Sequence, residues 1–273
     1  MIPKLWARRA VEEMSQTLLK TCKSNRDLCS LQAQADFKHL VYYLNNDYHK
    51  TMKAVHDYVK RDMPLSFILK EHWFGDLRLK VRPPVLIPRI ETEHWINQLL
   101  LKEHDLSNMR ILDVGTGSGC IALAIAKAFP SSSVVGIDIS KRAITLARLN
   151  ALGNKVGNAY FIRSSFKAFA TNLQNVASFD LIVSNPPYIP HSRRLPKSVR
   201  CFEDRCALYS GPDGMQMINE ILSNYTCLLR PCSNDGSVPY RLIIEFDSPN
   251  HERLPPEILI RPDQFNVPRT MWI

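Results

Sequence analysis

The sequence predicts an α/β protein, in which helices cover both faces of a sheet, with a small helical domain in front of it. From residue 110 to residue 245, short apolar runs of strand length alternate with stretches of helical periodicity, which is typical of a parallel sheet. The first 62 residues contain no glycine and a single proline, and their apolar residues recur at helical spacing. We therefore expect a helical domain over residues 1–62, a hairpin linker over 63–89 and the α/β domain over 90–273.

Length and composition restrict the class of protein. The chain of 273 residues suffices for one or two domains, and its 45% of hydrophobic residues is ordinary for a globular protein with a sizeable core. No apolar run approaches the roughly 20 residues that cross a bilayer, so we expect no membrane association. The formal charge of +9 suits an acidic partner such as nucleic acid or a ribosome, and it also suits a basic organellar protein. Charge alone does not decide between an acidic partner and an organellar location.

The cysteines indicate a reducing compartment and no metal. There are seven, they are scattered, and their odd number argues against a fully paired disulfide framework. Cys201/Cys206 and Cys227/Cys232 are each spaced as C-x4-C, which is looser than the usual pairs of zinc ligands. Cys227 also falls within a helical apolar pattern. We expect no metal site.

The N-terminus resembles the start of a mitochondrial presequence. Residues 1–11 include three basic residues and no acidic one. Glu12 and Glu13 follow immediately, however, and such segments avoid acidic residues. These residues alone leave a presequence and an ordinary first helix equally open.

The helical domain and the linker are predicted from local patterns. Phe37, Leu40 and Leu44 lie at helical spacing, and Asn45–Asp47 indicates a break between two helices. In the linker, apolar and basic residues alternate over Leu77–Val81, which predicts a half-buried strand of a hairpin. Prolines then stiffen the chain up to the next helix, whose first turn is acidic as the helix dipole favours.

The α/β domain is expected to contain strands at five apolar runs. These are Ile111–Val114, Val134–Asp138, Ala159–Arg163, Phe179–Ser184 and Arg241–Glu245. Between them, an alanine-rich helix is expected over Cys120–Phe129, and Ser140 is a candidate cap for the next helix. A further helix is expected from about Met215 to Leu229.

A glycine-rich turn follows the first of these strands. Glycine permits a bound group to approach the backbone closely, and Asp138 lies 23 residues beyond Gly115 at the end of the second strand, where a carboxylate meets the hydroxyls of an adenosine ribose. The spacing is G-x-G-x-G instead of G-x-G-x-x-G, which favours a nucleoside without a pyrophosphate, namely S-adenosylmethionine. The candidate cofactor residues are Gly115, Thr116, Gly117, Ser118, Gly119 and Asp138. The turn alone leaves a structural role or another nucleotide open.

Asn185-Pro186-Pro187-Tyr188 ends a later apolar run. The two prolines terminate the strand, and Pro186 forces Asn185 into an extended conformation. The Asn185 amide oxygen and the Pro186 carbonyl are then two fixed acceptors beside the Tyr188 ring, which suits a planar –NH2 group. Seen alone, the four residues also fit an ordinary turn.

Together the two motifs favour a methyltransferase. Ligands of a parallel sheet bind outside the carboxyl ends of its strands, so the methyl donor and the –NH2 acceptor would face each other. An amide nitrogen is a poor nucleophile, and hydrogen bonds from its protons to Asn185 and Pro186 would aim its lone pair at the methyl group. Positioning and fixed dipoles would supply most of the rate.

The chain resembles the HemK/PrmC family of glutamine N5-methyltransferases, which modify class I peptide-chain release factors. The matching stretches lie within about residues 30 to 247, and they are Pro64–Leu69, Val85–Glu93, Ile111–Gly119, Ser184–Ile189, Phe202–Asp204, Ala207–Leu208 and Gly211–Gly214. The resemblance implies a Rossmann-like, seven-stranded class I S-adenosylmethionine-dependent methyltransferase domain behind a helical bundle. It also implies the substrate, the glutamine of a Gly-Gly-Gln loop.

The resemblance assigns roles to individual residues. Asn185, Pro186, Pro187 and Tyr188 would hold the glutamine together with Arg89, and Asn185 would also border the cofactor. Asn185, Pro186 and Tyr188 would be catalytic, and Phe166 sits where the family places an aromatic near the adenine. The helical domain would recognise the release factor, and we expect a monomer that needs no nucleic acid. Family members with this domain are bacterial or organellar, and the basic N-terminus favours the mitochondrial matrix.

The chain departs from the family pattern at two places. The family often has an acidic residue just before the aromatic, and here it is Ser165. The family usually ends in a helix and a β-hairpin, whereas the tail after Phe246 is short and rich in proline, which leaves its last strands open.

Two alternatives differ in kind from glutamine methylation. An adenine-N6 methyltransferase acting on DNA or RNA would share the tetrapeptide, and basic residues between His191 and Arg200 would then contact phosphates. A cofactor-binding scaffold that has lost its activity through the divergent tail is the non-enzymatic alternative.

Overall fold

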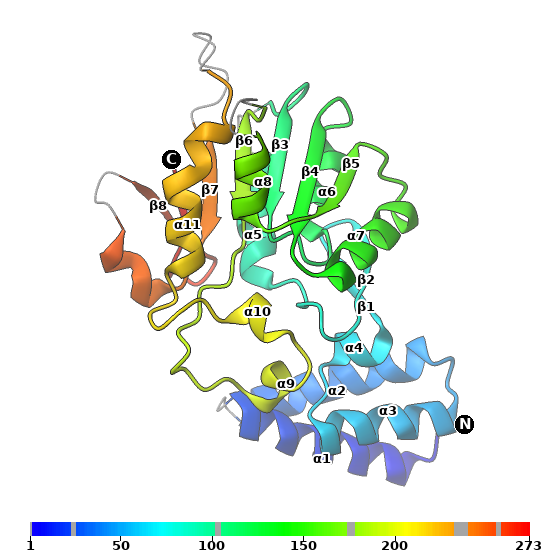
Figure 1. The fold of residues 1–273 in the computed structure, drawn as a ribbon. Helices are drawn as coiled ribbons and strands as arrows, with labels where there is room; N and C mark the ends of the chain where they lie inside the picture. Colours follow the sequence, from blue (N-terminus) through cyan, green and yellow to red (C-terminus); the bar gives the residue numbers. More distant parts are fainter. Residues whose placement is uncertain (1, 23–25, 102–104, 174–177, 232–239, 255–257) are drawn as a thin grey trace. The chain divides into compact units, whose positions relative to one another are not determined.

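The computed structural model describes residues 2–22, 26–101, 105–173, 178–231, 240–254 and 258–273. The chain divides into two compact units, one comprising Met1–Glu71 and Arg194–Glu203, the other His72–Arg193 and Asp204–Ile273 (Figure 1). We refer to them as the helical unit and the sheet unit. Their limits differ from the predicted domain boundaries, whose functional meaning stays a prediction. Among the described residues, no helix is long and apolar enough to span a membrane.

In its described residues, the helical unit consists mainly of helices. Its elements are α1 (Lys4–Cys22), α2 (Arg26–Tyr43), α3 (Tyr48–Arg61), α4 (Leu65–Leu69) and α9 (Lys197–Arg200). The predicted break is confirmed, because Asn45 and Asn46 adopt left-handed φ angles of 52° and 60° and Asp47 caps α3 by accepting a hydrogen bond from the Lys50 N–H. Residues of α1 belong to the core of this unit, where Met14 is fully buried.

A seven-stranded sheet organises the other unit. Its strands are β3 (Arg110–Val114), β4 (Ser133–Asp138), β5 (Ala159–Arg163), β6 (Leu181–Ser184), β7 (Leu242–Glu245), β8 (Leu259–Pro262) and β9 (Pro268–Trp272). Their order is β5-β4-β3-β6-β7-β9-β8, parallel from β5 to β7 and antiparallel at β9 and β8. The predicted fold class is therefore confirmed. From β3 the chain adds strands on one side as far as β5 and then continues on the other side with β6, so the strand order switches between β3 and β6. Open parallel sheets bind ligands at such a switch point, at the carboxyl ends of the strands.

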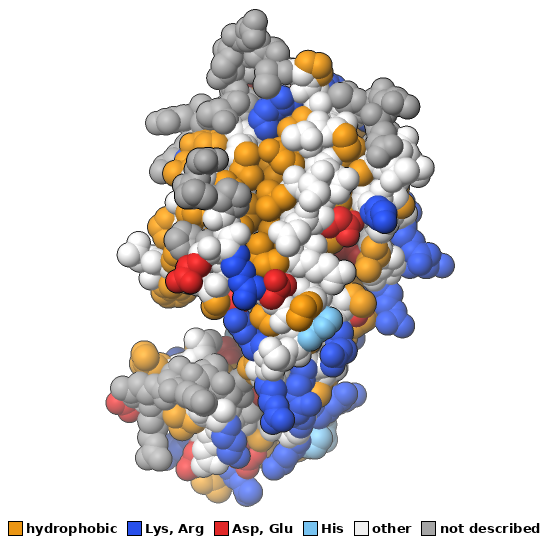
Figure 2. Space-filling view, turned by 60° about the vertical axis from the view of Figure 1, so that its left-hand side comes forward, with side chains coloured by type: hydrophobic (Ala, Val, Ile, Leu, Met, Phe, Trp, Pro, Cys, Tyr) orange, Lys and Arg blue, Asp and Glu red, His pale blue; other side chains and the backbone are white. Residues whose placement is uncertain are grey.

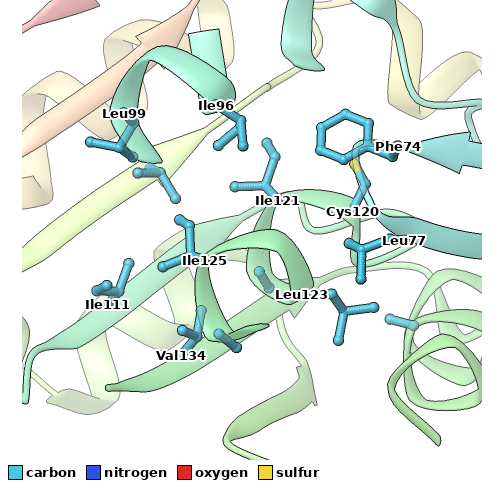
Figure 3. Close-up of a cluster of buried hydrophobic side chains, with 14 of the residues drawn as sticks. Phe74, Leu77, Ile96, Leu99, Ile111, Cys120, Ile121, Leu123, Ile125 and Val134 are labelled. Atoms are coloured by element: carbon cyan, nitrogen blue, oxygen red, sulfur yellow. The ribbon is translucent and has the colours of Figure 1, made fainter. Parts of the chain in front are cut away.

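Helices pack on both faces of this sheet. They are α5 (Ile90–Leu101), α6 (Cys120–Ala128), α7 (Lys141–Gly153), α8 (Phe166–Leu173) and α11 (Gln216–Asn224), with the 3-10 helix η1 (Tyr225–Leu228). The short helix α10 (Arg205–Leu208) lies in the connection from β6 to α11, and the 3-10 helix η2 (Ser248–Arg253) lies in the connection from β7 to β8. One core lies between the sheet and α5, α6 and α7, and it includes Ile96, Ile121, Ile125 and Val134 (Figure 3). The second core lies between the other face and α8 and α11 (Figure 1). The expected Met215–Leu229 helix is thus shorter and ends in a 3-10 turn.

The linker hairpin packs against the sheet unit. Its strands are β1 (Glu71–Phe74) and β2 (Leu77–Lys80), and alternation buries Leu77 and Leu79 while Arg78 and Lys80 are exposed, as predicted. Phe74 and Leu77 join the α5–α6 core (Figure 3). The side chain of Asn150 on α7 bonds the backbone of Lys80 in both directions, accepting from its N–H at 2.7 Å and donating to its C=O at 3.1 Å.

The proline-rich tail completes the sheet. β9 pairs with β7 and β8 pairs with β9, so the last strands that the sequence left open are present. Pro262 ends β8 and Pro268 begins β9, where a missing N–H interrupts no internal ladder bond. Asp263 stabilises the turn between them by accepting from the N–H groups of Phe265 and Val267. Divergence of the tail therefore gives no reason to expect a scaffold without activity.

We expect the terminal hairpin to contribute substantially to stability. Trp272 is 2% exposed and packs in the core, so Trp272→Ala should lower the free energy of unfolding by about 3–5 kcal/mol in urea titrations. Phe265, in the turn, is 66% exposed, and Phe265→Ala should change the same quantity by less than about 0.5 kcal/mol. Equal effects of the two substitutions would show that the hairpin does not pack as described.

Candidate active site

The predicted glycine turn lies at the carboxyl end of β3 and is tied to β4. Gly115, Gly117 and Gly119 have φ angles of 74°, 55° and 84°, a region that favours glycine. The N–H groups of Gly115 and Thr116 both donate to the Ile137 carbonyl at 2.9 Å. The turn is therefore a fixed part of the sheet edge.

Close packing explains two of the glycines. A Cβ atom on Gly119 would lie 3.1 Å from the Ala147 Cβ on α7, and one on Gly136 in β4 would lie 2.6 Å from the Thr116 hydroxyl oxygen. Neither neighbour is the far end of a flexible chain. Side chains at these positions would displace the turn, so the glycines bring α7, β4 and the turn together.

The first strand contributes a buried acid beneath the turn. Asp113 accepts from the Thr116 hydroxyl at 2.6 Å and from the Ala122 N–H at 3.2 Å through Oδ2, while its buried Oδ1 has no partner among the described residues. Burial raises the pKa of Asp113 to about 7. An unpaired buried acceptor is costly, so it suits a ligand that brings N–H donors or a positive charge.

Asp138 ends β4 beside the turn, as predicted. Its Oδ2 accepts from the Gly117 N–H at 3.0 Å, and its Oδ1 accepts from the Ser140 N–H at 2.8 Å. Burial raises the pKa of Asp138, and these two hydrogen bonds act in the opposite direction. Each oxygen keeps a lone pair for a further donor such as a ribose hydroxyl. The next residue, Ile139, is 54% exposed.

Asn185 lies next to the glycine turn. Val114 pairs with Ser184 in the parallel ladder between β3 and β6, so the residues that follow them are neighbours. A Cβ atom on Gly115 would lie 3.8 Å from the Asn185 carbonyl oxygen. The side chain of Asn185 is partly buried and donates from Nδ2 to the hydroxyl oxygen of Thr92 at 2.8 Å.

A buried carboxylate at the end of β7 connects these groups. Glu245 is fully buried, and its Oε2 accepts from the Thr92 hydroxyl at 2.7 Å and from the Trp95 indole N–H at 2.8 Å. Its Oε1 accepts from the Tyr188 hydroxyl at 3.0 Å. Burial raises the pKa of Glu245, and burial together with the Glu245 charge raises the pKa of Tyr188 well above its usual range.

The structure brings most of the predicted site residues to one sheet edge. Asp138 ends β4, and Gly115–Gly119 and Asn185–Tyr188 follow the carboxyl ends of β3 and β6. Arg89 immediately precedes α5, and its positive charge opposes the rise in the pKa of Tyr188 that burial causes. Phe166 differs, since it begins α8 and is 2% exposed in the core, so its contact with an adenine stays a prediction.

Sequence reasoning missed three residues of this region. Thr92 and Glu245 were assigned only to a helix and a strand, and Asn150 was not considered. Asn150 is 1% exposed and donates to the Ser118 carbonyl at 2.9 Å, which supports the glycine turn. Each left a signal: Glu245 is an acid that ends a wholly apolar strand, and Asn150 interrupts the apolar face of a helix that carries Leu146.

The cysteine pairs show no cluster where the chain is described. Cys201 and Cys206 are free and exposed, and Cys232 lies outside the described residues. No group of three His, Cys, Asp or Glu side chains that could hold a metal ion occurs in the described part of the chain.

Comparison with known proteins agrees with this fold. A profile described as "Methyltransferase domain" matches residues 105–254. A solved structure titled "SMU.776, a putative methyltransferase complexed with SAH" has the same fold, with a TM-score of 0.50, 9% identity and coverage of 75% of this chain and 56% of that one. Fold and site thus define a methyltransferase domain.

Several curated relatives share one name. A "Release factor glutamine methyltransferase" of Rhodopirellula baltica is 38% identical over 188 residues, which are 67% of this chain and 60% of that protein. One of Coxiella burnetii is 35% identical over 227 residues, 79% of this chain and 78% of that protein. The "Mitochondrial MRF1 N(5)-glutamine methyltransferase MTQ1" of Saccharomyces cerevisiae is 34% identical over 187 residues, with 65% and 59% covered.

The chain belongs to the family of release factor glutamine methyltransferases, as its motifs predicted. Its match spans 60% and 64% of the length of the relatives from Rhodopirellula baltica and Flavobacterium psychrophilum.

The buried acid beneath the turn predicts a pH-dependent stability. In the unfolded chain Asp113 loses its proton near the usual 3.8, and in the folded chain near 7, so folding favours the protonated form. Between about pH 4 and pH 7, rising pH should therefore lower the free energy of unfolding by up to about 1.4 kcal/mol per pH unit through this group. Below pH 4 and above pH 7 the contribution should be constant.

Asp113→Asn removes this titration. Chemical unfolding at a series of pH values, without cofactor, gives the free energy of each protein, and the difference between variant and wild type isolates the effect. We expect that difference to move in favour of the variant as pH rises from 4 to 7 and then to level off. A difference that does not vary with pH would contradict the assignment.

Proposed function

We propose that the protein transfers a methyl group from S-adenosylmethionine to the side-chain amide nitrogen, N5, of the glutamine in the Gly-Gly-Gln motif of a class I peptide-chain release factor. It would thereby support translation termination. The observation that carries this proposal is that the glycine turn and Asn185 lie side by side after the paired ends of β3 and β6. The names of the relatives supply the glutamine and the release factor.

The residues beside the turn fit S-adenosylmethionine. The three glycines at 115, 117 and 119 offer backbone without side chains, and the unpaired Oδ1 of Asp113 suits the ammonium group of the cofactor. Asp138 would accept from the ribose hydroxyls, and Phe166 stays a candidate for the adenine. When bound, the cofactor supplies an electrophilic methyl group on a sulfonium.

The Asn185–Tyr188 segment would hold the glutamine amide. Asn185 Oδ1 and the Pro186 carbonyl each accept one of its N–H bonds, which increases the electron density on nitrogen and directs its lone pair towards the donor side. Pro187 and the Tyr188 ring bound the flat faces of the amide, and Arg89 contributes positive charge nearby. No strong base is needed, because the proton leaves the nitrogen after transfer. Fixed acceptors of this kind supply rate through orientation.

Three further properties belong to this proposal. The helical unit would recognise the release factor, in accord with the predicted domain role, and the enzyme would act as a monomer without nucleic acid.

The name of the yeast relative, the charge of +9 and the basic residues of α1 support a location in the mitochondrial matrix. Lys and Arg side chains cover more of the surface than acidic ones on the face drawn in Figure 2. Imaging of a C-terminally tagged chain tests this location.

The adenine-N6 alternative is less favoured, because the relatives are named for glutamine. Arg193, which was a candidate for phosphate contact, forms an ion pair with Asp247 within the protein. Arg194, Lys197 and Arg200 nearby are exposed.

A methylation assay tests the proposed function. Purified protein with labelled S-adenosylmethionine should transfer label to a class I release factor and not to the same factor with Gln→Ala in its Gly-Gly-Gln motif. The alanine factor is the matched control, because it keeps every other contact. Equal labelling of both factors would refute the proposal, and strong, salt-sensitive labelling of naked nucleic acid would favour the adenine alternative.

Two substitutions should separate the donor and acceptor sides of the site. Asn185→Ala should bind S-adenosylmethionine as the wild type does in calorimetry. It should lose methyl transfer, because the substitution removes a hydrogen-bond acceptor for the N–H group of the glutamine amide. Asp138→Ala should weaken cofactor binding by roughly 10- to 100-fold, the usual effect of losing hydrogen bonds to a charged group. Normal transfer by Asn185→Ala would show that the proposed mechanism is wrong.

A further inference from the structure

The side chain of Asn185 has two orientations of similar shape, and only one accepts hydrogen bonds from an –NH2 group. Rotation by 180° about the last bond exchanges the amide oxygen and nitrogen. If the amide nitrogen of Asn185 pointed towards the bound substrate, its two N–H groups would face the N–H groups of the substrate amide and could accept no hydrogen bond from them. Function therefore requires that the protein select one orientation.

Thr92 makes this selection through its single proton. A hydroxyl donates one hydrogen bond and accepts up to two. The Thr92 hydroxyl donates to Glu245 Oε2 at 2.7 Å, so it has only lone pairs left for Asn185. The Asn185 amide must then direct its nitrogen to Thr92, at the observed 2.8 Å, and turn its oxygen away. Among the described residues, that oxygen has no hydrogen-bond donor.

Glu245 in turn fixes the proton of Thr92. Oε2 also accepts from the Trp95 indole, which is a donor only, so this oxygen is held as an acceptor. Oε1 accepts from Tyr188. Burial raises the pKa of Glu245, while its three hydrogen bonds and the charge of Arg269, which is paired with Asp263 at 3.1 Å, act in the opposite direction.

We infer that Glu245 and Thr92 are positioning residues for methyl transfer, because together they turn the Asn185 amide so that its oxygen faces the acceptor nitrogen. This inference rests on the proposed function and adds two residues to it. The same carboxylate orients the Tyr188 hydroxyl. Glu245 therefore orients both side chains proposed to contact the glutamine amide, Asn185 and Tyr188. Neither positioning residue touches the substrate in this account.

Thr92→Val tests the inference, because valine has nearly the shape of threonine and lacks the hydroxyl. We expect kcat on the release factor to fall by roughly 100-fold, as a misoriented catalytic group does, while KM for S-adenosylmethionine is unchanged. Thr92→Ser keeps the hydroxyl and should restore most of kcat. A structural role alone would not separate valine from serine in this way.

A matched control measures the general cost of losing a buried hydroxyl. Ser132 is 3% exposed and donates to the Phe129 carbonyl at 2.6 Å. It lies just before β4 begins, at the amino-terminal ends of the parallel strands and away from the site at their carboxyl ends. Ser132→Ala should lower the thermal unfolding midpoint and leave kcat unchanged. If Ser132→Ala reduces kcat as much as Thr92→Val does, the inference is refuted.

A double-mutant cycle adds a sharper criterion. Thr92 acts through Asn185, so Thr92→Val should slow the reaction little further in an Asn185→Ala background. Single-turnover assays with enzyme in excess measure such slow variants. Additive losses from the two substitutions would contradict the inference.

One readout does not depend on the substrate. In 15N spectra of the free protein, the Asn185 side-chain amide should exchange its protons slowly in the wild type and in Thr92→Ser, and rapidly in Thr92→Val. Equal exchange in all three proteins refutes the inference. If the exchange pattern is as expected and the wild type does not methylate the release factor, the positioning network stands and the proposed function fails.

Discussion

The candidate site depends on one buried carboxylate and the three hydrogen-bond donors that surround it. A fully buried, unpaired carboxylate would cost the folded state several kcal/mol. Glu245 avoids that cost by accepting from Thr92, Trp95 and Tyr188. Because Thr92 and Trp95 belong to α5 and Tyr188 follows β6, the carboxylate at the end of β7 holds three separate segments in one arrangement. The same three hydrogen bonds to Glu245 therefore stabilise the carboxyl end of the sheet and orient the side chains that are proposed to hold the glutamine amide.

The parallel ladder supplies the second requirement, which is that donor and acceptor groups are neighbours. Pairing of Val114 with Ser184 places the glycine turn beside Asn185 whatever their side chains. Asn150 then supports the turn from α7, with hydrogen bonds to both Ser118 and the β2 backbone. The linker hairpin thus belongs to the architecture that shapes the site, although the sequence indicated only a connection between domains.

The sequence predicted the features that local patterns determine. Apolar runs gave the five parallel strands, and the glycine spacing with Asn185–Tyr188 indicated the site and the family. Long-range contacts were not predictable in this way: Glu245 meets Thr92 across 153 residues of sequence. The tail was left open because its prolines were counted without regard to position, and Pro262 and Pro268 occupy strand ends where they are tolerated. Phe166 followed the family pattern, but the core that buries it could not be seen from its neighbours in sequence.

The most direct measurement of the central claim is a high-resolution crystal structure of the protein with S-adenosylhomocysteine and a peptide that contains Gly-Gly-Gln. The account predicts that the glutamine amide nitrogen lies within hydrogen-bond distance of Asn185 Oδ1 and the Pro186 carbonyl, with Asn185 Nδ2 still on Thr92 and Thr92 on Glu245. A glutamine amide bound away from Asn185, or one that meets Asn185 while Thr92 bonds neither partner, would contradict it.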